Sequence, residues 1–326
     1  MFSNMTGPEI HKIFIQVLEN KIPRKTKLAD FLVESLYIEK EAAYRRLRGD
    51  VQFSFHEVVR IAQKLHISID EIILKTSPEI KKTITLQFPV YPDKNKQYLV
   101  EFEKAIEIIE KVVNEPYSEF GIALSALPSH IFYRYDNITK FHFLKYFHYS
   151  RESSGVISFN EIKESDERIL SRKKYYSCFS LFSNTYYIWD RKIISTIVND
   201  IKYFESIKLI QQEDIIELKD ELYQLLYNLE ALTSLGEYKD TGNKFELYIS
   251  CVNIGMSYSY LYTERFNMML LATLGFLASV SEEEFLFNRV KNWINSLKRC
   301  SVLISGIDDR ERIAFFDQQR EIVSTL

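Results

Sequence analysis

The sequence predicts a mainly α-helical protein, with an N-terminal domain of five helices and a larger C-terminal domain that is helical or α+β. Three observations support this prediction. The chain has 326 residues, which is about two domains of ordinary size. Hydrophobic residues make up 46% and charged residues 27%, as in globular proteins. Only nine glycines and seven prolines occur, which favours long regular elements. We expect domains at residues 1–76 and 97–326, joined by a linker at 77–96.

The first two helices are predicted from apolar spacing. The first extends from about Pro8 to Glu19, and the second begins at Thr26, a residue suited to an N-cap. The first stripe consists of Ile10, Ile13, Val17 and Leu18, and the second of Leu28, Phe31, Leu32 and Leu36. Arg24, Lys25 and Lys27 surround the start of the second helix. The N–H groups at such a helix end bind phosphate readily.

Two capping boxes fix the starts of the fourth and fifth helices. They are Ser54 with Glu57, and Ser68 with Glu71. In a capping box the serine and glutamate side chains satisfy opposite backbone donors at the helix N-terminus. Hydrophobic staple pairs accompany both starts, Phe53 with Val58 and Ile67 with Ile72.

An arginine-rich third helix is predicted at residues 39–49, closed by a glycine C-cap at Gly49. Ala43 and Leu47 form its inward stripe. The opposite face of this helix carries Glu41, Arg45 and Arg48, with Ala42 and Tyr44 on either side. Arginine can bond bidentately to guanine, glutamate can accept from cytosine, and alanine can touch a thymine methyl. The predicted DNA-binding residues are Arg24, Lys25, Thr26, Lys27, Lys40, Glu41, Ala42, Tyr44, Arg45 and Arg48. The alternative is that these are solvated charges on a surface helix.

This N-terminal region resembles a known family. Its segments Leu28-Ala-Asp-Phe-Leu, Ala43-Tyr-Arg-Arg-Leu-Arg-Gly49 and Ile61-Ala-Gln-Lys-Leu-His-Ile-Ser-Ile-Asp-Glu-Ile72 are similar to Cro/CI (XRE) helix-turn-helix regulators, particularly BetR-like members. The resemblance covers residues 8–76. It implies a Cro/repressor-like fold whose helix Ala42–Arg48 enters the major groove. The chain departs from the family pattern in two ways. The interval from Leu28 to Gly49 is longer, and the usual glycine of the turn is replaced around Glu34–Ile38.

The charge distribution agrees with this division. Residues 1–82 carry 14 lysines and arginines against 11 acidic residues, a net charge of +3. The remaining residues carry 28 against 34, a net charge of −6. A positively charged N-terminal region is compatible with a polyanion such as DNA as its partner.

Two helices of the C-terminal domain have heptad-like spacing. One is predicted at residues 95–114 and the other at 215–232, ending at Gly236. Their stripes are Leu99, Phe102, Ile106, Ile109 and Val113, and Ile215, Leu218, Leu222, Leu225, Leu229 and Leu232. Either stripe could pair with a second copy or pack inside the domain. The second helix is the better candidate for dimerisation.

Strands are predicted by alternating apolar residues. Residues 245–251 and 256–262 should form a hairpin with a turn at Asn253–Gly255. Further strands are expected at 83–88 in the linker, and at 121–126, 186–189 and 301–305. A last helix should begin with a capping box from Ser281 to Glu284 and extend to Arg299. It should bury Phe285, Val290, Trp293, Ile294 and Leu297.

The C-terminal domain lacks recognisable catalytic motifs. Cys178, Cys251 and Cys300 are far apart in the sequence, which argues against a zinc site or a disulfide framework. His142 and His148 should be partly buried among aromatic residues rather than bind a metal. The many aromatic residues at 175–189 and 258–262 could line a ligand cavity or form ordinary core.

Membrane insertion is not expected, because the longest apolar stretch, residues 268–280, is shorter than the roughly 20 residues that span a bilayer. No secretory signal is found.

We therefore expect a cytoplasmic transcriptional regulator, with no enzymatic activity, cofactor or metal. Its expected partners are double-stranded DNA, a second copy in a homodimer, and a small-molecule or protein effector. Two alternatives stay open. One is a protein-interaction adapter whose helix-turn-helix does not bind DNA, and the other is an enzyme with an unrecognised C-terminal active site.

Overall fold

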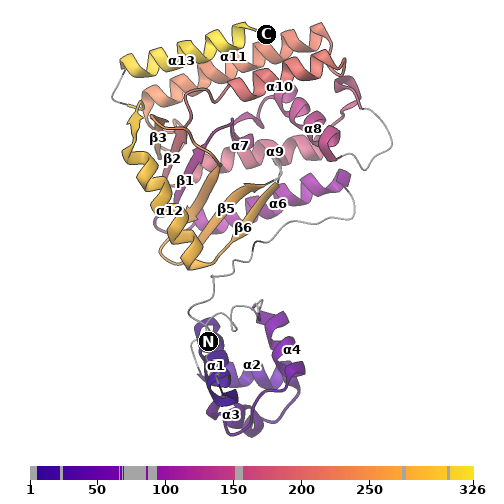
Figure 1. The fold of residues 1–326 in the computed structure, drawn as a ribbon, viewed down its shortest axis with the longest axis vertical. Coiled ribbons are helices and arrows are strands. Elements are labelled where there is room, and N and C mark those ends of the chain that lie inside the picture. Colours follow the sequence, from indigo (N-terminus) through magenta and orange to yellow (C-terminus); the bar gives the residue numbers. More distant parts are fainter. Residues whose placement is uncertain are drawn as a thin grey trace. The chain divides into compact units, whose positions relative to one another are not determined.

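A computed structural model describes residues 6–22, 25–65, 67, 69, 86, 94–150, 157–273, 277–306 and 309–326. The chain divides into two compact units, Met1–Thr85 and Leu86–Leu326 (Figure 1). We call these the N-terminal unit and the larger unit. The larger unit contains both helices and a sheet, so the chain is mainly α-helical with an α+β part.

Four helices of the N-terminal unit are described: α1 (Gly7–Lys21), α2 (Lys25–Leu36), α3 (Lys40–Arg48) and α4 (Phe55–Leu65). They share one apolar core, made of Phe14, Val17, Leu18, Leu28, Leu32, Leu36, Ala43, Ile61, Ala62 and Ile67. The predicted fifth helix and its capping box at Ser68 lie outside the described residues.

Two details of the predicted helices are corrected. In α1 the buried face is His11, Phe14, Val17 and Leu18, whereas Ile10 is 43% exposed. Val17 and Leu18 are buried as predicted, but His11 and Phe14 take the place of Ile10, and Ile13 is only partly buried. Helix α2 begins at Lys25, so Thr26 lies in its first turn rather than at the N-cap.

The predicted capping box at the start of α4 is confirmed. The backbone N–H of Ser54 donates to Glu57 Oε2 at 2.8 Å, and the backbone N–H of Glu57 donates to Ser54 Oγ at 3.3 Å. These two bonds satisfy donors that a helix N-terminus otherwise leaves unpaired.

The larger unit is built on a seven-stranded mixed sheet with the order β6-β5-β4-β1-β2-β3-β7. Strands β1, β2 and β3 are parallel, and all other neighbours are antiparallel. The strands are β1 (Glu119–Leu124), β2 (Asn184–Trp189), β3 (Lys244–Ser250), β4 (Tyr258–Tyr262), β5 (Asn267–Thr273), β6 (Leu277–Ser281) and β7 (Ser301–Leu303).

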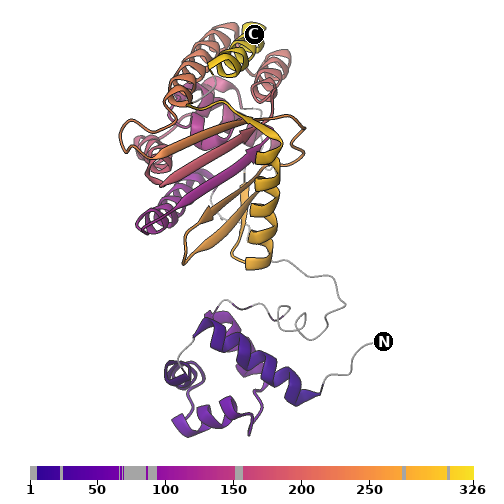
Figure 2. The ribbon, with the colours of Figure 1, turned by 90° about the vertical axis from the view of Figure 1, so that its left-hand side faces the viewer.

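Helices cover both faces of this sheet (Figure 2). One face packs against α12 (Glu284–Arg299). The other face packs against α6 (Lys94–Val113), α7 (Ser129–Phe132), α8 (Asp136–Ser150), α9 (Asp166–Cys178), α10 (Ser195–Ser206), α11 (Gln212–Leu235) and α13 (Asp309–Ser324).

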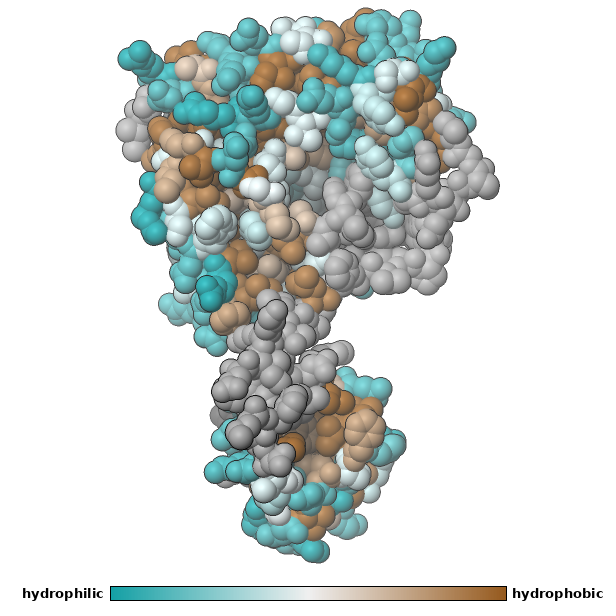
Figure 3. All heavy atoms as spheres, viewed as in Figure 1, coloured by the Kyte–Doolittle hydropathy of each residue, from teal (hydrophilic) through white to brown (hydrophobic). Residues whose placement is uncertain are grey.

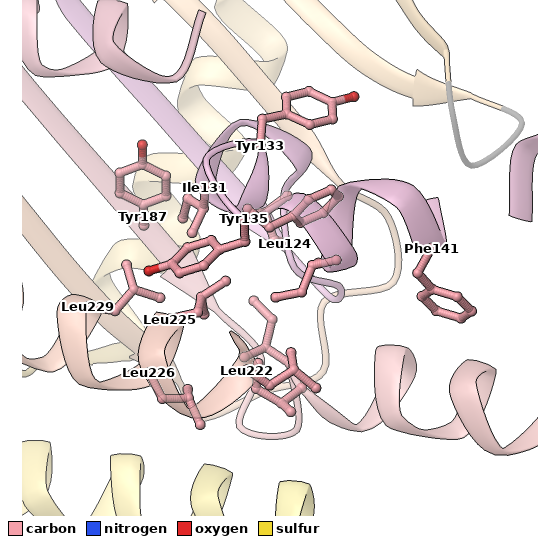
Figure 4. Close-up of a cluster of buried hydrophobic side chains, with 14 of the residues drawn as sticks. Leu124, Ile131, Tyr133, Tyr135, Phe141, Tyr187, Leu222, Leu225, Leu226 and Leu229 are labelled. Atoms are coloured by element: carbon pink, nitrogen blue, oxygen red, sulfur yellow. The ribbon is translucent and has the colours of Figure 1, made fainter. Parts of the chain in front are cut away.

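Alternation along the strands explains the two cores. Successive side chains of a strand point to opposite faces. In β2, Tyr187 and Trp189 join the larger core, while Tyr186 and Ile188 face α12. The larger core also receives the apolar stripe of α11, as Figure 4 shows for Leu222, Leu225 and neighbouring residues.

The predicted hairpin between residues 245–251 and 256–262 is wrong. Strand β3 pairs with β2 and β7, whereas β4 pairs with β1 and β5. The segment Asn253–Gly255 therefore connects strands separated by β1 and β2 rather than closing a tight turn. Strands β2 and β7 occupy the two edges of β3, so neither edge is left for β4. The apolar stretch at 268–280 forms β5 and β6, which the sequence analysis did not predict.

The last predicted helix is present but is shifted. Ser281 is the final residue of β6, and α12 begins at Glu284 with Glu283 as N-cap. The predicted capping box is therefore absent, and Ser281 Oγ accepts from the backbone N–H of Glu283 instead. Phe287 is buried against the sheet, whereas Phe285 is 39% and Trp293 54% exposed.

The described residues of both heptad-like stripes pack inside the larger unit. Phe102, Ile106 and Ile109 of α6 and the leucines of α11 are buried in one core. The better predicted dimerisation surface, the α11 stripe, is therefore not available to a second copy. Helix α6 begins at Lys94, so the predicted linker ends earlier than residue 96. The strand-like segment at 83–88 lies outside the described residues except for Leu86.

Many of the aromatic residues in the two segments belong to the hydrophobic cores. Tyr186 and Tyr260 are 2% and 0% exposed, and their hydroxyls are hydrogen-bonded to each other. Both rings flank Gly121, which pairs with the two tyrosines in the sheet. A separate shallow hollow of about 450 Å³ lies on α11, lined by Tyr223, Gln224, Tyr227 and Asn228.

The surface of the larger unit shows hydrophobic residues in separate patches among hydrophilic ones on the face drawn in Figure 3. No helix among the described residues is long and apolar enough to cross a membrane.

The two histidines of α8 lie among aromatic rings, as predicted. The ring of His142 is 5.2 Å from that of Phe132, and the ring of His148 is 5.1 Å from that of Phe204. Within the described ranges, no group of three or more histidine, cysteine or acidic side chains is arranged to hold a metal ion.

Candidate nucleic-acid interface

The arginine-rich helix α3 follows α2 after a three-residue turn, Tyr37–Glu39. A short turn between two packed helices is the connection that DNA-binding helix-turn-helix motifs use. Tyr37 has a positive φ of 55°, which is uncommon for a residue other than glycine. It lies within the segment Glu34–Ile38.

Helix α3 ends at Gly49 in a Schellman motif. Gly49 has φ 83°, and its N–H donates to the carbonyl of Arg46 at 3.0 Å. The N–H of Asp50 donates to the carbonyl of Arg45 at 2.9 Å. The left-handed conformation favours glycine here. The C-terminus of α3 is thus closed as the sequence predicted.

One arginine of α3 is structural. Arg46 Nη2 lies 2.8 Å from Glu57 Oε1, and both side chains are largely buried, at 16% and 15% exposed. Arg46 Nη1 also donates to the carbonyl of Ala42 at 3.2 Å. The Arg46 carbonyl lies 2.8 Å from His11 Nε2. Arg46 therefore ties α3 to α4, and its backbone contacts α1.

The inward and outward faces of α3 are as predicted. Ala43 is fully buried, and Leu47 packs against the core. Glu41, Arg45 and Arg48 are exposed, with Ala42 and Tyr44 half-buried beside them. The structure therefore places all five predicted base-facing or flanking residues on the outer side or at its edge.

The charges on this outer face are mostly paired. Arg48 bonds to Glu41 Oε1 at 3.0 Å and to Asp50 Oδ2 at 2.9 Å. Lys40 bonds to Asp30 Oδ1 at 2.9 Å. The hydrogen bonds that the cations donate to these carboxylates, first to Glu41 for Arg48 and to Asp30 for Lys40, raise the pKa of both cations. Exposed ion pairs of this kind are weak and exchange readily for other anions.

Arg45 differs from its neighbours. Its side chain makes no ion pair or hydrogen bond with any residue that the structure describes. It lies on the exposed face of α3, beside Glu41 and Ala42 around the helix. A guanidinium without an internal partner has all five donors available for a ligand.

The predicted residues around the start of α2 are only partly described. Lys27 is exposed in the first turn of the helix. Lys25 and Thr26 belong to α2, but their side chains lie outside the described part, and so does Arg24.

Two residues beside the α2–α3 turn were missed by the sequence analysis. Tyr37 is 80% exposed, and the guanidinium carbon of Arg60 lies 5.2 Å from the centroid of its ring. The available signal was an aromatic residue, Tyr37, within the segment Glu34–Ile38 that joins the two predicted helices. The pair adds an aromatic ring and a cation next to α3.

A scan of protein-family models, a search of curated proteins and a search of solved structures each find no match to this chain.

Proposed function

We propose that the protein is a sequence-specific DNA-binding transcriptional regulator that inserts α3 into the major groove. The observation that carries this proposal is the exposed face of α3, where Arg45 has no internal partner among the described residues. Arginine is the side chain that most often reads a base directly, through guanine O6 and N7.

The other residues fit supporting roles. Lys40 and Arg48 would exchange their exposed carboxylate partners for DNA phosphates. Arg60, beside the α2–α3 turn, would contact the sugar-phosphate backbone of the DNA. Such contacts position a protein on DNA without reading its sequence. Because several of these cations are paired in the free protein, the affinity should depend only moderately on salt.

The experiment is a selection of duplexes from a random-sequence library by the full chain, followed by fluorescence anisotropy. The selected duplex is compared with a scrambled one for wild type and Arg45→Ala. The substitution should weaken binding to the selected duplex by about 1–3 kcal/mol and change binding to scrambled DNA less. Lys12→Ala is the matched control, because Lys12 is an exposed cation on α1 rather than α3. Equal losses in both variants would refute readout by Arg45.

The second candidate is a protein-interaction adapter built on the same helices. The pairing of Lys40 and Arg48 with carboxylates favours it, because it leaves little uncompensated positive charge on α3. An adapter would select no duplex from the library, at low or high salt.

A further inference from the structure

Two of the three cysteines, remote in sequence, are neighbours in the sheet. Strands β3 and β7 are antiparallel, and their last register pair is Ser250 with Ser301. One step further along this register places Cys251 opposite Cys300. The backbone N–H of Cys251 donates to the carbonyl of Cys300 at 3.1 Å, while the N–H of Cys300 donates to Leu297, so a single backbone bond joins the two cysteines just beyond the strands.

This placement brings the two cysteines within reach of each other. The backbone hydrogen bond between them holds their Cα atoms close together. Disulfides join Cα atoms about 4.4–6.8 Å apart. Both cysteines are exposed, and both are free thiols in this structure. The third cysteine, Cys178, is buried, and burial raises the pKa of its thiol.

We propose that Cys251 and Cys300 form a modification site at which an intramolecular disulfide is made and broken by exchange with a low-molecular-weight disulfide. One cysteine thiolate attacks a sulfur of the small disulfide and releases the first small thiolate. The other cysteine thiolate then attacks the mixed disulfide and releases the second. Two protein thiols are oxidised, one small disulfide is reduced to two thiols, and the two protons pass to the released thiolates.

The disulfide would restrain the C-terminal end of α12. Cys300 is the C-cap residue of this helix, and Cys251 directly follows β3. The disulfide would close the chain from residue 251 to residue 300, which includes β4, β5, β6 and α12. It would fix the C-terminal end of α12 to the sheet. This inference is independent of DNA binding.

The test uses the folded full chain in buffers of reduced and oxidised glutathione at several ratios. Samples are quenched with acid, alkylated and analysed by intact and peptide mass spectrometry. Wild type should lose two hydrogen atoms and yield a peptide pair linked through Cys251 and Cys300. Cys251→Ser and Cys300→Ser should instead each carry one glutathione on the remaining cysteine. Cys178 should resist alkylation before denaturation, which reports that the unit stays folded.

The melting temperature distinguishes an intramolecular disulfide from the attachment of glutathione to a single cysteine. Oxidised wild type should melt several degrees above the reduced protein, because a cross-link restricts the unfolded chain. Oxidised Cys251→Ser should gain no such stability. The proposal is overturned by two glutathiones on one wild-type molecule, by disulfide-linked dimers, or by an unreacted wild type in a buffer that modifies the single variants.

Discussion

Replacing Gly121 with alanine should destabilise the larger unit through a steric clash. A Cβ at this position would lie 2.7 Å from Cζ and Oη of Tyr186 and 2.7 Å from Cε1 of Tyr260, whereas ordinary contact begins at 3.4 Å. The rings must therefore retreat by about 0.7 Å against a close-packed interior. Neither has space, because both are buried and Tyr260 packs edge-on against Phe287 of α12 at 5.6 Å.

The cost follows from two contributions. Overpacking a tight core costs about 1–3 kcal/mol. Moving Tyr260 also strains the bond from its hydroxyl to Glu119 Oε1, which is 2.7 Å long, and hydrogen bonds to charged groups contribute about 1.5–3 kcal/mol. Since that bond need not be lost completely, we expect Gly121→Ala to lower the free energy of unfolding by about 2–4 kcal/mol.

Tryptophan fluorescence during urea unfolding is a selective assay. The chain has two tryptophans, Trp189 and Trp293, and both belong to the larger unit. Gly255→Ala is the matched control, because a Cβ there meets nothing within 4 Å. It should change stability by less than about 0.5 kcal/mol. If Gly121→Ala and Gly255→Ala unfold at the same urea concentration, the steric argument is refuted.

Three further predictions concern single side chains. Partial burial alone would raise the pKa of Glu57, but hydrogen bonds from Arg46 and Ser54 outweigh it and hold the pKa below 4.5. The N-terminal unit should therefore lose stability as the pH falls below 4.5, and circular-dichroism melts of Glu57→Gln should show a flatter dependence. Burial lowers the pKa of His130 from 6.5 to about 3. Between these values only the unfolded chain binds the proton, so stability should fall by about 1.4 kcal/mol per pH unit on acidification. The pKa of His142 is also lowered to about 3, mainly by burial, so His130→Gln should remove only the His130 contribution to the slope in urea titrations. An unchanged slope would contradict the assignment. Leu222→Ala should cost about 2–5 kcal/mol, since Leu222 is fully buried, and a loss below about 1 kcal/mol in the same fluorescence assay would show that the site collapses around the cavity.

Local signals predicted the helices well. The ends of α3 and α11 follow from Gly49 and Gly236, both of which adopt the left-handed conformation that stops a helix. The start of α4 follows from Ser54 and Glu57 three residues apart. Each of these features depends on neighbours in the chain, so it can be predicted from a short window of sequence.

Strand pairing could not be predicted in the same way. The segments that became β3 and β4 alternate correctly and are close in sequence, but each found a partner elsewhere. One partner of β4 is β5, the next strand in sequence, but the other is β1, which precedes it by more than a hundred residues. Alternation defines which face of a strand is apolar, but it does not define the neighbouring strand.

The sequence predicted which side chains of α3 face outward, but it did not predict the ion pairs that they form. Helical spacing correctly separated the exposed Arg45 from the buried Ala43. It did not predict that Arg48 bonds to Glu41 and Asp50, because those contacts depend on rotamers at the end of the helix. The inward position of Arg46 depends on Glu57 of another helix.

The order of the strands also constrains how the protein is made on the ribosome. Once β1, β2 and β3 have emerged from the ribosome they can assemble, but the edge of β1 that later receives β4 is still open. An open apolar edge is a template for pairing with another nascent chain. Premature termination between β3 and β4 should therefore yield an aggregating fragment rather than a smaller folded one.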